Sequence, residues 1–199
     1  NGKLTIAKRT VTLKSADLSK EYDGTALVNG ETALETETGW AEGEGATYTF
    51  TGSQTVVGSS ANEFSYALND GTNADNYEIT KTEGTLTVTN RAEKYEITIT
   101  AKSGTKTYNG KEQEVTGFVT DKFTVNGQEY TVSGLSAEGK GTDAGEYTAE
   151  VTGTAMVTDA TGNDVTAQFT VKTENGKLTI AKRTVTLKSA DLSKEYDGT

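Results

Sequence analysis

The chain has 199 residues, and none of them is Cys, His or Pro. Without Cys and His it has no disulfide framework, no thiolate or imidazole metal site and no Ser-His-Asp or Cys-His triad, so we expect a protein that is not an enzyme. Its formal net charge of −10 opposes binding to nucleic acid and to anionic lipid, and no apolar run is long enough to insert in a membrane.

The first segment of the chain, Asn1–Thr25, returns without a change as Asn175–Thr199. The period between the two copies is 175 − 1 = 174 residues. Identical segments at a fixed period are the signature of a tandem array. We therefore expect the chain to be a window from a longer array whose unit has 174 residues.

A weaker half-repeat divides this unit. Tyr22, Tyr108 and Tyr196 are each followed by Asp-Gly or Asn-Gly, with spacings of 108 − 22 = 86 and 196 − 108 = 88 residues. Two diverged modules therefore alternate in the predicted array. The predicted organisation is residues 1–8 as the last strand of a preceding B-type module, 9–90 as module A, 91–182 as module B, and 183–199 as the first strand and turn of the next module A.

Short runs with a hydrophobic period of two recur along both modules, and Gly-rich or Asx-Gly pieces separate them. Alternation in Thr-rich, β-branched segments is typical of half-buried strands, and no stretch has a helical period. The sequence predicts an all-β fold made of small Ig-like β-sandwich modules arranged end to end. The predicted strands are centred on 4–6, 11–13, 48–50, 64–68, 77–79, 86–88, 95–99, 123–125, 130–132, 147–151 and 169–171.

The repeated segment itself contains a change of hydrophobic phase. Leu4 and Ile6 have even numbers, whereas Val11 and Leu13 have odd numbers, so the inward-facing parity flips across Ala7–Thr10. Such a flip turns the other face of the chain to the core. We therefore interpret Ala7–Thr10 as the crossing from the last strand of one module to the first strand of the next.

Two loops are dense in oxygen ligands of the kind that calcium prefers. Neither loop fits the EF-hand spacing, and acidic turns are also common without metal. Both readings stay open, with no cofactor as the expectation and calcium as the alternative. The candidate metal ligands are Asp70, Asn73, Asp75, Asp159, Asn163 and Asp164.

Trp40, the only Trp, lies in a Gly-rich acidic loop. It is the candidate ligand-binding residue, because a lone aromatic ring can stack on a sugar, and the alternative is a plug over one end of its module. For Tyr22 the pattern favours a buried ring whose hydroxyl bonds to a backbone group, before a turn at Asp23-Gly24. No strand framework is evident that would fix a catalytic pair among Glu35, Glu37, Glu42 and Glu44, and no catalytic residue is predicted.

Taken together, these markers resemble the YDG/MBG-type repeats of large bacterial surface proteins. The matching pieces are Lys20–Gly24, Asp143–Tyr147, and Asn76–Ile79 followed by Gly84–Val88, and module B departs from the pattern at Asn109 and at Gln168–Val171. The resemblance implies an extracellular all-β repeat of an adhesin-like or stalk-forming protein. Such repeats sometimes carry a Lys–Asn isopeptide bond, but Lys14 is in the outward phase of its strand, where we expect a solvated side chain.

The function expected from these observations is a structural one. Neighbouring modules of the same chain would form an elongated, semi-rigid stalk or fibre on a bacterial cell surface, anchored to the cell wall outside this segment, and would project an adhesive or other tip. One alternative is that the repeats themselves bind a glycan or a host protein. A second alternative is a fibre subunit that associates with identical chains through exposed strand edges.

Overall fold

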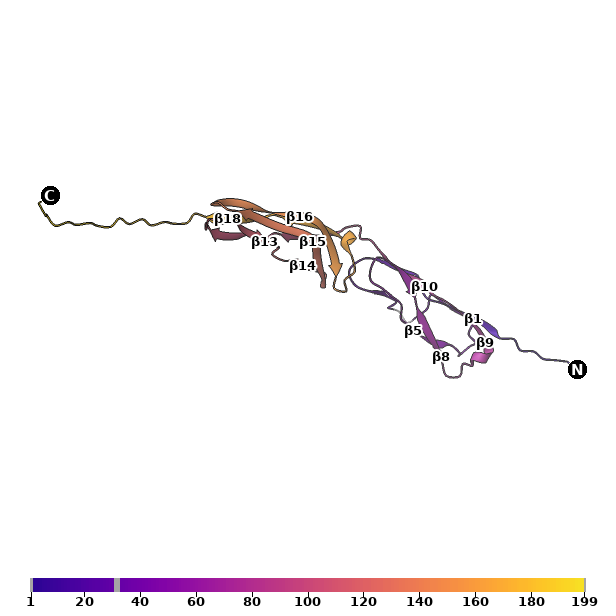
Figure 1. The fold of residues 1–199 in the computed structure, drawn as a ribbon. Helices are drawn as coiled ribbons and strands as arrows, with labels where there is room; N and C mark the ends of the chain where they lie inside the picture. The colour runs from indigo at the N-terminus through magenta and orange to yellow at the C-terminus, as the bar shows by residue number, and fades with distance from the viewer. Residues whose placement is uncertain (1, 31–32, 199) are drawn as a thin grey trace. The chain divides into compact units, whose positions relative to one another are not determined.

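The computed structural model describes residues 2–30 and 33–198, and its regular structure is almost entirely β-strand (Figure 1). Within this part of the chain, two short 3-10 turns are the only helical elements, η1 (Ala74–Asn76) and η2 (Thr166–Gln168). The prediction of an all-β fold is therefore confirmed. Its finer form, Ig-like sandwiches in tandem, goes beyond what the sheets show and stays a prediction.

The chain divides into two compact units, each built from several segments of the sequence. The first unit takes Asn1–Ile97, Lys122–Ser133 and Ala155–Val171, and the second takes Thr98–Asp121, Gly134–Thr154 and Lys172–Thr199. The predicted modules 9–90 and 91–182 remain predictions. In the described ranges there is no helix long and apolar enough to cross a membrane.

The first unit contains two three-stranded sheets with mixed strand directions. In one, β1 (Arg9–Lys14) pairs in parallel with β9 (Tyr77–Thr82) and antiparallel with β4 (Thr36–Thr38). In the other, β10 (Gly84–Thr89) pairs in parallel with β2 (Leu18–Glu21) and antiparallel with β7 (Gly58–Asn62). The unit also contains two antiparallel pairs: β3 (Leu27–Val28) with β6 (Ser53–Gln54), and β5 (Ala46–Phe50) with β8 (Phe64–Leu68).

Alternation along β1 produces the core of this unit. Val11 and Leu13 are fully buried, whereas Thr12 between them is partly exposed, as expected for a strand with one face on the core. Phe64 and Tyr77 join them in the buried cluster. Partly buried side chains surround that cluster: Leu34, Trp40, Ala41, Tyr48, Phe50 and Ile79.

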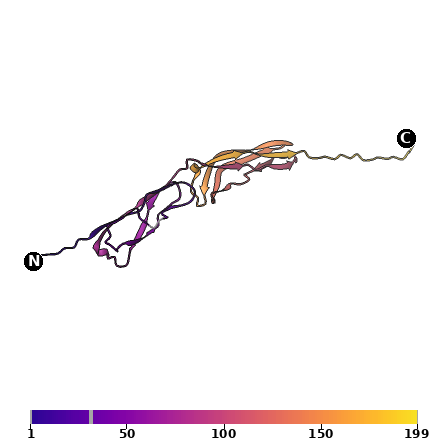
Figure 2. The same cartoon turned by 180° about the vertical axis from the view of Figure 1, so that it is seen from behind.

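The second part of the chain is dominated by two long strands, β15 (Gln128–Gly141) and β16 (Gly145–Asp159). The strand order in their sheet is β12-β18-β16-β15-β13, and both Figure 1 and Figure 2 show β15, β16 and β18 side by side. The other strands of this sheet are β12 (Gly104–Thr107), β13 (Gln113–Thr116) and β18 (Gly176–Ala181), and β14 (Lys122–Val125) also pairs with β15. A separate two-stranded sheet pairs β11 (Tyr95–Thr100) with β17 (Phe169–Glu174).

The length of β15 and β16 is not evident from the hydrophobic pattern, which predicts only the short runs 130–132 and 147–151. Glycines interrupt the alternation, but they serve the pairing of these strands. A Cβ at Gly139 would lie only 2.9 Å from the Ala149 Cα, and Gly153 has a φ of +102° that other residues adopt at a cost. Glycine inside a strand is therefore a sign of close backbone approach here rather than of a strand end.

The same local geometry occurs in both units, at positions related by the half-repeat. A Cβ at Gly84 would overlap the backbone oxygens of Ser15 and Ala16, and a Cβ at Gly176 would overlap those of Ala101 and Lys102. Likewise, the Tyr22 N–H donates to the Thr89 carbonyl at 2.9 Å, and the Tyr108 N–H donates to the Ala181 carbonyl at 2.9 Å. The last strand, β10 or β18, is thus held by equivalent contacts in the two units.

The two copies of the repeated segment adopt different structures. Residues 2–8 form no strand, whereas the identical residues 176–181 form β18, between β12 and β16. Conversely, β1 and β2 lie within the first copy, but the described residues 182–198 form no strand and appear as a thin trace at the C-terminal end of Figure 1.

Candidate functional site

An aromatic cluster joins residues of predicted module A to residues of predicted module B. All of its members lie in the first compact unit. We name this cluster the aromatic junction, and its residues are Tyr22, Arg91, Tyr95, Tyr130, Gln168 and Phe169.

The Tyr-Asp-Gly turn supplies the module A side of the aromatic junction. Tyr22 is 1% exposed, so the predicted burial of its ring is confirmed. The prediction that its hydroxyl bonds to a backbone group is wrong. The hydroxyl instead lies 3.4 Å from the Tyr130 hydroxyl, in a weak hydrogen bond. Gly24 follows with a φ of +83°, and a Cβ there would overlap the Tyr130 hydroxyl. Glycine is therefore required twice, for the backbone conformation and for the approach of Tyr130.

The module B side is a stack of three rings. Phe169 packs edge-on against Tyr130, with ring centroids 4.8 Å apart, and against Tyr95 at 5.5 Å. Such tilted and edge-to-face pairs contribute about 0.5–1.5 kcal/mol each beyond the area they bury. Contact with Phe169 therefore holds the Tyr130 ring, whose hydroxyl meets Tyr22.

Arg91 ties the two sides together. Its guanidinium carbon lies 4.0 Å from the centroid of the Tyr95 ring, and its Nη1 donates to the Tyr22 carbonyl at 3.0 Å. The backbone N–H of Arg91 donates to Oε1 of Gln168, a buried side chain whose Nε2 donates to Asn90 Oδ1 at 2.6 Å. A buried amide satisfied on both ends fixes the path of the chain between β10 and β11.

Burial controls the ionisation of the two tyrosines that meet there. Burial, followed by the hydrogen bond with Tyr130, raises the pKa of Tyr22 well above its usual range. Burial also raises the pKa of Tyr130. Both phenols stay neutral at ordinary pH, so the aromatic junction is a packed contact and not an acid–base pair.

Trp40 packs at the other end of the first unit's core. Its ring meets Tyr77 edge-on at 4.9 Å, and its Nε1 donates to Glu37 Oε1 at 2.9 Å. The same carboxylate oxygen accepts from the Tyr48 hydroxyl at 2.6 Å, and Arg9 Nε donates to the Gly39 carbonyl beside Trp40. Through these contacts the Trp40 ring packs against the core of the first unit, as the plug interpretation expects. The role of Trp40 as a ligand-binding residue stays a prediction.

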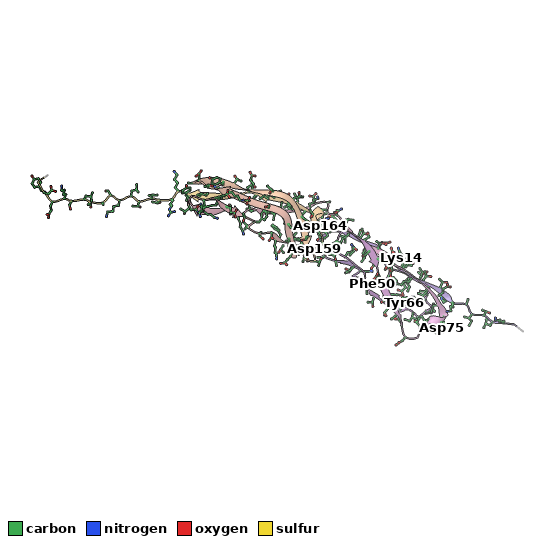
Figure 3. The ribbon with its side chains drawn as sticks, viewed as in Figure 1. Lys14, Phe50, Tyr66, Asp75, Asp159 and Asp164 are labelled. Atoms are coloured by element: carbon green, nitrogen blue, oxygen red, sulfur yellow. The ribbon has the colours of Figure 1, made fainter. Side chains whose placement is uncertain are left out.

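The first acidic loop forms the turn at η1. Asp70, Asn73 and Asp75 are all exposed, and Asn73 Oδ1 accepts from the Asp75 N–H at 3.0 Å to begin the turn. Figure 3 labels Asp75 in this region. The Asn73 side chain is therefore used as a cap.

The second acidic loop follows β16, where Figure 3 labels Asp159 and Asp164. Asp159 Oδ1 accepts from the Thr161 and Asn163 N–H groups at 2.9 Å, and Asn163 Nδ2 donates to its Oδ2. Burial opposes ionisation of Asp159, but these hydrogen bonds outweigh it and lower the pKa of that carboxyl. Asp164 accepts from the Thr166 hydroxyl and N–H in the same way.

A calcium site in either loop stays a prediction. In the ranges that the structure describes, no three His, Cys, Asp or Glu residues are grouped so that they would hold a metal ion. The loop oxygens for which hydrogen bonds are described serve the local turns.

The glutamates on either side of Trp40 contact different partners. Glu35 lies 2.7 Å from Lys14 Nζ, Glu37 accepts from Trp40 and Tyr48, and Glu44 accepts from the Tyr77 hydroxyl. Lys14 is half-buried and also lies 3.3 Å from Asp17, which places its amine among carboxylates at the surface. The hydrogen bonds that Lys14 donates to Glu35 and to Asp17 raise the pKa of its amine.

Comparison with models of protein families gives no match, and comparison with curated proteins gives none. The chemistry of the site is therefore argued from its geometry.

The sequence pattern identified Tyr22 but not its partners, which are Tyr130, Phe169, Arg91 and Gln168. Their contacts join residues as far as 108 positions apart, and no local pattern carries such a pairing.

Proposed function

We propose that this chain is a structural repeat of an extracellular bacterial surface protein of the YDG/MBG type. Its two alternating β-modules, Ig-like in their predicted form, follow one another end to end in a semi-rigid stalk that projects an adhesive or other tip. The observation that carries the proposal is the repeated segment, whose first part forms β18 in the second copy and whose second part forms β1 and β2 in the first copy.

The aromatic junction supports stiffness where module A passes into module B. A flexible linker between modules would be rich in Gly and Ser and poor in buried contacts. Here the connecting residues Asn90 and Arg91 are instead held by Gln168 and by the Tyr22 carbonyl. Bending at this point would expose Tyr22 and Tyr130, which are both 1% exposed.

The acidic composition is consistent with the same role. The chain has a net charge of −10, and because residues 175–199 contribute 5 − 3 = +2, each 174-residue repeat carries −10 − 2 = −12, so successive modules and neighbouring stalks repel each other. Repulsion of this kind favours an extended chain over a collapsed one at low ionic strength.

Glycan binding at Trp40 takes second place because the indole is already engaged. Its N–H donates to Glu37 and one edge packs on Tyr77. Fluorescence of Trp40 titrated with a panel of glycans distinguishes the two functions, because a saturable change with any glycan would support binding.

Solution scattering from chains with one, two and three 174-residue repeats tests the stalk directly. We expect the maximum dimension to grow by an equal increment with each repeat. The matched control carries Tyr22→Ala and Arg91→Ala in every repeat, which should keep the β-sheet circular dichroism but shorten the mean dimension. A particle whose size fails to grow with repeat number would overturn the proposal.

A further inference from the structure

The second unit has an uncovered counterpart of the aromatic junction. Tyr108 occupies the same place after its module's second strand as Tyr22, with an equivalent backbone bond to the last strand. Yet Tyr108 is 37% exposed, whereas Tyr22 is 1% exposed. A shallow hollow surrounds the Tyr108 ring, and its lining residues are Tyr108, Ala144, Lys182 and Arg183. We name it the Tyr108 hollow.

The identity of the missing cover follows from the repeated segment. Lys182-Arg183 is the second copy of Lys8-Arg9. In the first copy this dipeptide lines a different hollow, at the η1 end of the first unit, together with Ala41, Glu44, Asp75, Asn76 and Tyr77. In a continuous array a single Lys-Arg dipeptide must line both hollows at once. The Tyr108 hollow of one repeat therefore meets the η1 end of the next.

The aromatic junction shows the same parts meeting. Arg91 stands three residues after Val88 of β10, and Arg183 stands three residues after Ile180 of β18. On the receiving side, Gln168 ends η2 and Phe169 follows it, as Asn76 ends η1 and Tyr77 follows it. The η1 end of module A is thus the positional equivalent of the η2 end that covers Tyr22.

Charge also fits this arrangement. The Tyr108 hollow carries the basic side chains Lys182 and Arg183, and the η1 end carries Glu44 and Asp75. In the first copy Arg9 reaches the Gly39 and Trp40 carbonyls of that end, at 3.0 and 3.4 Å. A cationic dipeptide between a tyrosine and an acidic end contributes attraction to either side.

We propose that the Tyr108 hollow is a docking surface for the η1 end of module A in a second copy of this repeat. The interface makes the passage from B to A a packed junction, like the passage from A to B. The proposal rests on the proposed function, because it requires the array to continue.

Paramagnetic relaxation in a chain of two consecutive repeats tests this docking. The chain contains no Cys, so Lys111→Cys in the first repeat gives a single site for a nitroxide near Tyr108. The second repeat is isotope-labelled by segmental ligation. We expect the amide signals of residues 41–45 and 74–77 in the second repeat to be broadened, with the other faces of that module unaffected.

Two variants make the test specific. Tyr108→Ala in the first repeat should abolish the broadening, and Asp75→Lys in the second repeat should weaken it. Tyr66→Ala is the matched control, since Tyr66 is also 37% exposed but lies on β8. Because Tyr108 and Asp75 are exposed, we expect all three variants to keep the spectrum of a folded chain.

The outcomes separate the docking from the function on which it rests. Docking is overturned if the second module A folds but shows no broadening, or shows weak broadening on all faces, or keeps it after Tyr108→Ala. If the second module A fails to fold with residues 183–199 as its first strands, the proposed function fails instead.

Discussion

The two copies of the repeated segment have one sequence and two complementary structures. Leu13 is 0% exposed in the first copy, and its counterpart Leu187 is 91% exposed in the second. At the fourth residue of each copy the difference in exposure is reversed: Leu4 is 88% exposed in the first copy, and its counterpart Leu178 is 0% exposed in the second. Each part of the segment is folded only where its partner strands are present: β9 and β4 beside β1, and β12 and β16 beside β18.

The comparison shows that local sequence does not decide whether these residues form strands. Strand preference depends on cross-strand neighbours and burial, and an isolated strand is not stable in water. Substitutions made at matching positions of the two copies therefore separate the effect of the residue from the effect of its surroundings. The following predictions use such pairs.

The largest difference is expected for Leu13→Ala and Leu187→Ala. The first substitution leaves a cavity in the core of Val11, Phe64 and Tyr77 and should lower the free energy of unfolding of the first unit by about 2–5 kcal/mol. The second removes an exposed side chain and should change it by less than about 0.5 kcal/mol. Urea unfolding followed by Trp40 fluorescence measures both, and equal effects would contradict the comparison.

A second pair is Gly24→Ala and Gly198→Ala. Both glycines have positive φ, but only Gly24 faces the Tyr130 hydroxyl. We expect Gly24→Ala to destabilise the first unit by roughly 1–3 kcal/mol from backbone strain, with the overlap adding to it, and to loosen the aromatic junction. Gly198→Ala should have no measurable effect. A neutral Gly24→Ala would mean that the junction tolerates a displaced Tyr130.

A smaller difference in stability is expected between Ile180→Val and Ile6→Val. In this pair the buried residue lies in the second copy of the segment. Ile180 is buried in β18, so loss of one methylene group should cost about 0.5–1.5 kcal/mol, whereas Ile6→Val should cost nothing measurable. Trp40 lies in the first unit, so this pair is measured by amide exchange of the second unit. Protection lost equally in both variants would contradict the assignment of the segment's first part to β18.

The smallest effect concerns acid stability. The Thr85 N–H donates to Asp17 at 2.7 Å, and this bond, followed by that from Lys14, lowers the pKa of the Asp17 carboxyl. A carboxyl whose pKa is lower in the folded state contributes stability above its unfolded pKa, and that stability is lost as the pH falls through the folded value. Asp17→Asn should therefore reduce the fall in stability below about pH 4.

The matched variant in the second copy is Asp191→Asn, in a part of the chain that forms no strand. It should leave the acid unfolding curve unchanged. The measurement is the unfolding midpoint at a series of pH values between neutral and strongly acidic. Identical curves for Asp17→Asn and the unaltered chain would show that the bond to Thr85 contributes nothing to stability.

Part of this fold could be predicted from the sequence, where the information is local. The alternation in Phe64–Leu68 matches β8, and the positive φ of Gly24 follows from the Asp23-Gly24 pair. Long-range choices could not be predicted. Nothing in the alternation of Val11 and Leu13 shows that β1 runs parallel to β9, because a strand of either direction buries the same face.

The aromatic junction was unpredictable for the same reason. Tyr130 and Phe169 lie in predicted strands, but only the topology brings them to Tyr22. The parity flip across Ala7–Thr10 was a local signal of a junction, since it indicates that the two parts of the segment face different cores.

The most direct measurement is amide hydrogen exchange by NMR in a chain of two consecutive repeats, in which the segment occurs three times. The copies are identical in sequence, so the middle copy alone is isotope-labelled by segmental ligation. We predict slow exchange both in its first part, the counterpart of β18, and in its second part, the counterpart of β1 and β2. Rapid exchange in either part of the middle copy would contradict the claim that the segment joins two folded modules.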